Sequence, residues 1–131
     1  MKKIHIGLAT LLLSSCANGY QPMYRYDEIL VVNNSKELIA NVTIDAVETG
    51  RSFSCGNIAP LGVCSDRFGS RPYRNSPLEI TWAFGNRAPQ IDRIQLAVPA
   101  TFPSGIPLRG VLDISPQGTI SAYFQQDTPV R

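Results

Sequence analysis

Apolar and polar residues alternate along several short segments of this chain, and this period limits its possible folds more than any other feature. The segment "LEITWAF", residues 78–84, places its larger apolar side chains on one face and smaller or polar ones on the other. The residues of the apolar face are Leu78, Ile80, Trp82 and Phe84. This period is typical of a β-strand with one buried face. The same alternation predicts strands at residues 40–46 and 92–98.

Turn signals separate these predicted strands and indicate the fold class. "RGVLDIS" and "TISAYFQQ" flank the turn signal "PQG", which predicts a hairpin over residues 109–126. A shorter apolar strand is expected at residues 28–32, and polar turn residues follow it at 33–35. Six or seven short strands, with a turn signal about every ten residues, favour an all-β fold. We expect an antiparallel β-sandwich, immunoglobulin-like in layout, with a small β-barrel as the alternative.

The opening segment, "MKKIHIGLATLLLSSCANGY", has the organisation of an export signal. Lys2 and Lys3 provide a positive start, and the apolar run that follows has about ten residues, whereas a bilayer span needs about twenty. The run ends in Leu13-Ser14-Ser15-Cys16, which resembles the lipobox of bacterial lipoproteins. In that family the cysteine receives a diacylglycerol, the signal is cut before it, and the new amine is often acylated.

The resemblance to bacterial lipoproteins implies a division of the chain and a location. It implies a signal peptide at residues 1–15, a lipidated Cys16 carrying fatty acids such as palmitate, and a tether at 16–26. Residues 27–131 are then the single β-sandwich domain. In that family an aspartate directly after the lipidated cysteine favours retention at the inner membrane. This chain has Ala17 there, so the resemblance implies an outer-membrane protein that faces the periplasm.

The chain has three cysteines, and acylation of Cys16 would leave Cys55 and Cys64 as a pair. In an oxidising periplasm such a pair is expected to form a disulfide. The alternative, a redox or metal pair, is disfavoured because the spacing is not CxxC and no histidine is available. "CGNIAPLGVC" is predicted to be a loop, and its two cysteines are too close in sequence for the bridge between sheets of a true immunoglobulin domain.

The composition of the mature chain excludes several functions. The only histidine, His5, lies in the signal segment, so the mature chain lacks the usual histidine-based nucleophile systems and zinc sites. We therefore expect neither an enzyme nor a metal or other cofactor. Removal of Lys2 and Lys3 lowers the twelve basic side chains to ten, which equals the number of acidic ones. This balance gives no indication of nucleic-acid binding.

The segment "DRFGSRPYRNSP" is the first candidate site. Arg67, Arg71 and Arg74 surround Tyr73, and Arg51 lies upstream. Guanidinium groups match carboxylates and phosphates, so the partner would be an anionic wall component, an anionic lipid or an acidic protein. The alternative is a solvated loop whose arginines pair with nearby acidic residues, which are Asp66, Glu48 and Glu79.

The segment "VPATFPSGIPLRG" is the second candidate site, because its prolines stiffen a loop that carries Phe102 and Ile106. If these two side chains face solvent, they form an apolar anchor for a partner. The alternative is that they cover one end of the core.

These features predict a non-catalytic cell-envelope lipoprotein that binds or scaffolds another envelope component. Its expected partners are the membrane, through the lipid, and an envelope protein or an anionic wall or lipid component. Two alternatives share its size and compartment: a periplasmic inhibitor of a lysozyme-type enzyme, and an accessory lipoprotein of a secretion or pilus assembly.

Overall fold

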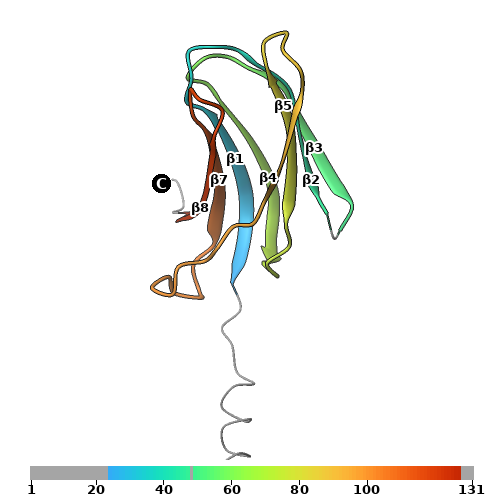
Figure 1. Cartoon of the computed structure of the whole chain (residues 1–131). Helices are drawn as coiled ribbons and strands as arrows, with labels where there is room; N and C mark the ends of the chain where they lie inside the picture. The colour runs from blue at the N-terminus through green and yellow to red at the C-terminus, as the bar shows by residue number, and fades with distance from the viewer. Residues whose placement is uncertain (1–23, 48, 128–131) are drawn as a thin grey trace, which may run out of the picture.

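The computed structural model describes residues 24–47 and 49–127, which form eight strands in two packed sheets (Figure 1). Sheet A has the order β4 (Val63–Pro72), β1 (Arg25–Asn33), β7 (Leu108–Ile114) and β8 (Ile120–Gln126). Sheet B has the order β3 (Arg51–Ile58), β2 (Ile39–Ala46), β5 (Leu78–Phe84) and β6 (Gln90–Ile94). The predicted β-sandwich is therefore confirmed, and the two sheets do not close into a barrel.

The predicted signal segment and Cys16 lie outside the described residues. Within the described ranges, no helix is long and apolar enough to cross a membrane.

The core lies between the two sheets, where the alternating faces meet. On β5 the predicted inner face is confirmed, since Trp82 and Ile80 are fully buried and Leu78 and Phe84 nearly so. The indole Nε1 of Trp82 donates a hydrogen bond of 2.9 Å to Oδ2 of Asp92 on β6. Trp82 is therefore a core residue whose one polar atom has a partner, as buried polar groups require.

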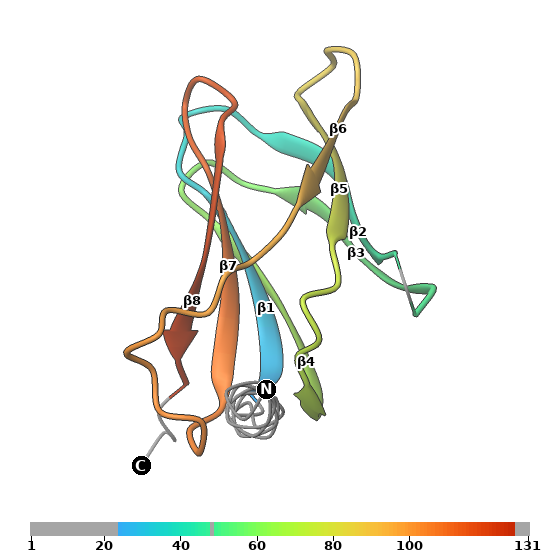
Figure 2. The ribbon, with the colours of Figure 1, turned by 60° about the horizontal axis from the view of Figure 1, so that its bottom comes forward.

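One strand pair departs from the predicted antiparallel arrangement, because β1 and β7 run parallel. β7 follows the segment 95–107, which crosses from β6 in sheet B back to sheet A (Figure 2). This crossover returns the chain to the end at which β1 begins, and β7 then runs alongside β1 from Leu108. Residues 34–107 separate β1 from β7, and a parallel pair needs a long connection of this kind, whereas a hairpin suffices for an antiparallel one.

The strand predicted at 92–98 is shorter than expected, because β6 ends at Ile94. Leu96 and Val98 nevertheless pack against the core from the irregular crossover segment. A side chain at Gly110 of β7 would place its Cβ 3.1 Å from Cδ1 of Leu96. The glycine therefore leaves room for Leu96, which covers the core without belonging to a strand.

The predicted hairpin is confirmed as β7 and β8, paired from Leu108–Gln126 to Ile114–Ile120. The amide of Gly118 donates to the carbonyl of Ser115 at 3.0 Å, and Gly118 has a φ of 85°. Only glycine adopts this conformation without strain, so the "PQG" signal sets the turn.

β3 and β4 occupy the region that was predicted to be loops, and the disulfide between Cys55 and Cys64 joins them. The disulfide prediction is confirmed, with Cα atoms 6.0 Å apart. The pair was expected to be too close in sequence for the immunoglobulin type of bridge between sheets around Trp82; it does join the two sheets, but at one edge of the sandwich. β3 and β4 are edge strands of opposite sheets and follow one another directly, so closely spaced cysteines can span the two layers at that edge.

Loss of the disulfide is expected to lower the free energy of unfolding by about 2.7 kcal/mol, from the entropy of closing a loop of roughly ten residues. The double variant Cys55→Ala/Cys64→Ala tests this by urea denaturation. Reducing agent should destabilise the original protein by a similar amount and leave the double variant unchanged. A reduced original protein as stable as the oxidised one would contradict the prediction.

Candidate functional site

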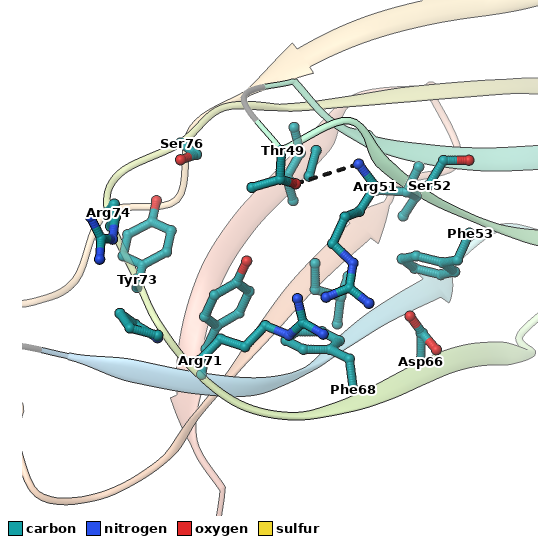
Figure 3. A pocket seen from close by; sticks show the side chains of 16 residues that line it. Thr49, Arg51, Ser52, Phe53, Asp66, Phe68, Arg71, Tyr73, Arg74 and Ser76 are labelled. Carbon is teal, nitrogen blue, oxygen red and sulfur yellow. Dashed lines mark hydrogen bonds between the residues drawn. The ribbon is translucent and has the colours of Figure 1, made fainter.

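A cavity of about 360 Å³ lies between the two sheets, at the end of the sandwich where β1 begins (Figure 3). Its lining residues come from β1 and β4 of sheet A, from β2, β3 and β5 of sheet B, and from the two turns that follow β2 and β4. Its volume falls within the range of roughly 300–1,000 Å³ that is usual for small-molecule sites. The cavity is therefore the candidate functional site.

A bulge in β1 directs two side chains into this space. Tyr26 and Ile29 both line the cavity, although residues three apart on a regular strand face opposite sides. The register of β1 with both neighbours shifts between Tyr26 and Glu28. Asp27 is an extra residue on β1, because the two steps from Tyr26 to Glu28 face one step on β7. The extra residue shifts the alternation of side chains, so that Tyr26 and Ile29 lie on the same inner face. β-Bulges redirect side chains in this way near functional sites.

A second irregularity lies opposite, on β4. Arg67 and Arg71, four residues apart on β4, pair with Glu28 and Tyr26, which are only two residues apart on β1. Gly69, with a φ of 79°, lies within this stretch. Phe68 and Arg71 therefore both line the cavity, whereas Arg67 does not.

Aromatic rings form one wall of the cavity. Tyr26 packs edge to face against Phe68 and Tyr73, with centroids 5.0 and 5.5 Å apart, and Tyr73 packs in the same way against Phe124 at 4.8 Å. Such pairs stabilise their geometry by roughly 0.5–1.5 kcal/mol beyond area burial, so the wall is fixed before any ligand arrives.

Both phenols of this wall remain neutral at physiological pH. Burial, with a smaller contribution from Tyr26, raises the pKa of Tyr73 to about 12. The hydroxyl of Tyr73 donates a hydrogen bond to the carbonyl of Leu96. Burial also raises the pKa of Tyr26, opposed by the charge of Arg51. The tyrosines therefore bring no negative charge to the cavity.

Three arginines from three segments converge on the cavity: Arg51 from β3, Arg71 from β4 and Arg74 from the following turn. Figure 3 shows the side chains of Arg51 and Arg71 extending toward one another near Phe68, and Arg74 beside Tyr73. Cζ of Arg71 lies 5.5 Å from the centroid of the Phe68 ring. None of the three guanidinium groups has an ion pair with a residue that the structure describes.

The charge of the cavity is therefore positive. Among its described lining residues, Asp66 is the only carboxylate, against three guanidinium groups. Two cations that extend toward one another beside an apolar wall repel each other, and an anion between them removes that repulsion. Guanidinium groups offer planar, bidentate donors that match a carboxylate or a phosphate.

The structure brings together only part of the first predicted site. Arg71, Tyr73 and Arg74 line the cavity, as does Arg51. The prediction of a loop was wrong for Arg67 and Arg71, because both lie on β4.

Arg67 points to the outer face of sheet A, away from the cavity. It forms ion pairs of 3.3 Å with Glu28 and 3.5 Å with Asp127, and neither partner is among the acidic residues that the sequence suggested.

The second predicted site does not join the cavity. Phe102 and Ile106 lie in the crossover segment and are half-buried, and Phe102 packs against the core. The hydroxyl of Tyr24 donates a hydrogen bond of 3.0 Å to the carbonyl of Phe102, which fixes the loop to the start of the described chain. The structure thus agrees with the alternative, in which Phe102 covers one end of the core.

A closed ionic network lies on the outer face of sheet A and was missed by sequence reasoning. The side chain of Glu28 is only 5% exposed, and its Oε1 accepts a bond of 2.6 Å from Nε of Arg109. Arg109 and Arg67 both also contact Asp127, at 3.0 and 3.5 Å. Glu28 is paired with Arg67 and Arg109 on its two neighbouring strands, so the sheet register creates the network.

Asp27 extends this network with a titratable group. Burial, followed by a hydrogen bond and charge repulsion from Asp127, raises the pKa of Asp27. A carboxyl whose pKa is raised on folding contributes stability below its unfolded pKa, and that contribution is lost as the pH rises through the folded pKa. Protonation of Asp27 therefore stabilises the fold at a pH below the pKa that Asp27 has in the folded protein.

Comparisons with known proteins do not name this site. No family model and no curated protein matches the chain. Among solved structures, the chain is similar to one described as "NMR structure of the protein from Eubacterium rectale". The TM-score is 0.46 at 10% identity, over 82% of this chain and 92% of that one. A likeness of this size carries no argument about function.

Proposed function

We propose that this chain is a non-catalytic, lipid-anchored binding module of the bacterial cell envelope, which faces the periplasm and holds an anionic envelope component. The observation that carries this proposal is the convergence of Arg51, Arg71 and Arg74 on one partly aromatic cavity, without an ion pair to any described residue. Such a site favours a ligand that combines an anionic group with an apolar body.

Two features support export and anchoring. The disulfide between Cys55 and Cys64 is of a kind that persists in oxidising compartments. The lipobox-like sequence at Leu13–Cys16 would supply the acyl chains, of which stable anchoring needs at least two.

The position of the cavity also fits this role. β1 begins at Arg25, nine residues after Cys16, and nine extended residues reach at most roughly 30 Å. Tyr26 at the start of β1 lines the cavity. The cavity would therefore lie at the end of the domain nearest the membrane.

Arg71→Glu is expected to reduce recovery of the envelope partner by about tenfold or more, because a hydrogen bond to a charged group contributes roughly 1.5–3 kcal/mol. The measurement is a crosslinking pull-down of the lipidated protein from its own membrane fraction, with the partner quantified by mass spectrometry. Arg93→Glu is the matched control, since Arg93 is exposed on β6 and outside the cavity.

Equal recovery with both variants would contradict the binding role of the cavity. A muramidase, or a secretion or pilus component, as the Arg71-dependent partner would establish one of the alternative roles instead. Recovery of the protein from cytosol, uncleaved and with a bare Cys16 thiol, would contradict the anchor.

A further inference from the structure

We infer that the ligand of this cavity is a single-chain anionic lipid, an acyl chain that ends in a carboxylate or a phosphate. The inference rests on the proposed function, because it names the ligand of the same cavity.

The inner walls of the cavity select an apolar ligand body. Ile29, Ile44 and Leu78 line the cavity and are themselves buried members of the core. Phe53 of β3 and Phe68 of β4 cover it from opposite sheets. A polar group placed among these side chains would lose its hydrogen bonds to water without replacement, whereas an acyl chain loses none.

The sandwich architecture selects one chain. Packed sheets lie about 10 Å apart, so the space between them admits a single layer of ligand atoms. The disulfide between Cys55 and Cys64 joins the sheets at the edge that borders the cavity, through β3 and β4, and so opposes their separation. A lipid with two acyl chains would need a wider slot, whereas a fatty acid or a lysophospholipid would fit.

The anionic end of the ligand is set by Arg51 and Arg71, which extend toward one another across the two sheets (Figure 3). The hydroxyl of Tyr26 has no hydrogen-bond partner among the described residues, and the charge of Arg51 acts on it. This neutral phenol can donate a further hydrogen bond to the same anion. Because Arg51 is exposed and Arg71 half-buried, the charged end stays near water while the chain enters the core.

The test is calorimetric titration of the mature chain with Cys16→Ser, exported behind a cleavable non-lipoprotein signal so that no attached lipid competes. The probes are straight-chain carboxylates from acetate to dodecanoate, octyl phosphate, lyso-phosphatidylglycerol and inorganic phosphate. Each amphiphilic probe is used below its critical micelle concentration. We expect affinity to rise about fourfold for each added methylene until the cavity is filled, the value for burying one methylene. Acetate and inorganic phosphate should not bind measurably.

Charge variants test the anionic end. Arg51→Gln and Arg71→Gln should each weaken octanoate binding by about tenfold or more, and Arg93→Gln should leave it unchanged. Arg51 is exposed, so its variant keeps the inference testable if Arg71→Gln disturbs the fold. Tighter binding of lyso-phosphatidylglycerol than of a fatty acid with the same chain would identify the phospholipid source, and the reverse order would identify a free fatty acid.

Three results would overturn the inference: equal binding of octanol or octyltrimethylammonium, equal binding of inorganic phosphate, or no rise in affinity with chain length. If one of these occurs while Arg71→Glu still releases the envelope partner, only the ligand class is wrong. If the acyl series binds but no Arg71-dependent partner exists in the envelope, the proposed function is wrong and the ligand chemistry holds.

Discussion

Glu28→Gln is expected to lower the free energy of unfolding by about 3 kcal/mol at neutral pH, the lower end of the cost of breaking a buried ion pair. The side chain of Glu28 is 5% exposed and contacts Arg109 at 2.6 Å and Arg67 at 3.3 Å. Glutamine keeps the shape of the side chain but removes its charge. Two guanidinium groups would then face each other with Asp127 as the remaining partner.

The measurement is urea denaturation of the non-lipidated mature chain with its disulfide intact. Arg67→Gln is the matched control, because the side chain of Arg67 is 56% exposed and its ion pairs are expected to contribute less than about 1 kcal/mol. Equal effects of the two variants would show that the network behaves as ordinary surface charge. Added salt should diminish the Arg67 effect more than the Glu28 effect, since buried pairs are poorly screened.

Trp82→Ala is expected to destabilise the fold by about 4 kcal/mol, within the usual range for removing a buried tryptophan. Trp82 is fully buried, packs edge to face against Phe84 at 4.9 Å and donates a hydrogen bond to Asp92. The alanine would leave a large cavity and an unpartnered carboxylate. Total stabilities of small domains are about 5–15 kcal/mol, so we expect this variant to lose a large part of the stability of the fold.

Trp82→Phe separates the two contributions, because it keeps an aromatic ring and removes only the indole donor together with part of the volume. We expect a smaller loss for it, about 1–3 kcal/mol, from the lost hydrogen bond to the charged Asp92. Thermal denaturation followed by circular dichroism measures both variants. A loss below 1 kcal/mol for Trp82→Ala would contradict a core role and would make a ligand-stacking role worth testing.

The sequence predicts the fold class because strand alternation is a local property. "LEITWAF" shows which side chains of β5 are buried, and "PQG" identifies the β7–β8 turn, without knowledge of any distant residue. The disulfide was predicted from cysteine number and compartment. β3 and β4 were missed because their inner faces carry Asp66 and small residues beside Phe53 and Phe68, which weakens the apolar period.

The candidate site was only partly predictable. Arg71, Tyr73 and Arg74 were identified from their clustering in sequence, and all three line the cavity. Arg51 could only be associated with them by proximity in sequence, although it lies on the opposite sheet. Arg67 was assigned to the same group, and the structure separates it from the others.

The amino-acid sequence by itself determined a two-layer β architecture and its main hairpin, since both follow from neighbours along the chain, and it determined the cysteine pairing through the number of cysteines. The tertiary structure alone decided which arginines share a cavity and which join the buried network of Glu28. The physical reason is that irregular strand pairing changes which face of the sheet each side chain occupies. Bulges at Asp27 and around Gly69 shift the alternation, so that Arg67 faces outward and Arg71 inward. Only the pairing of strands far apart in sequence then brings their charges together.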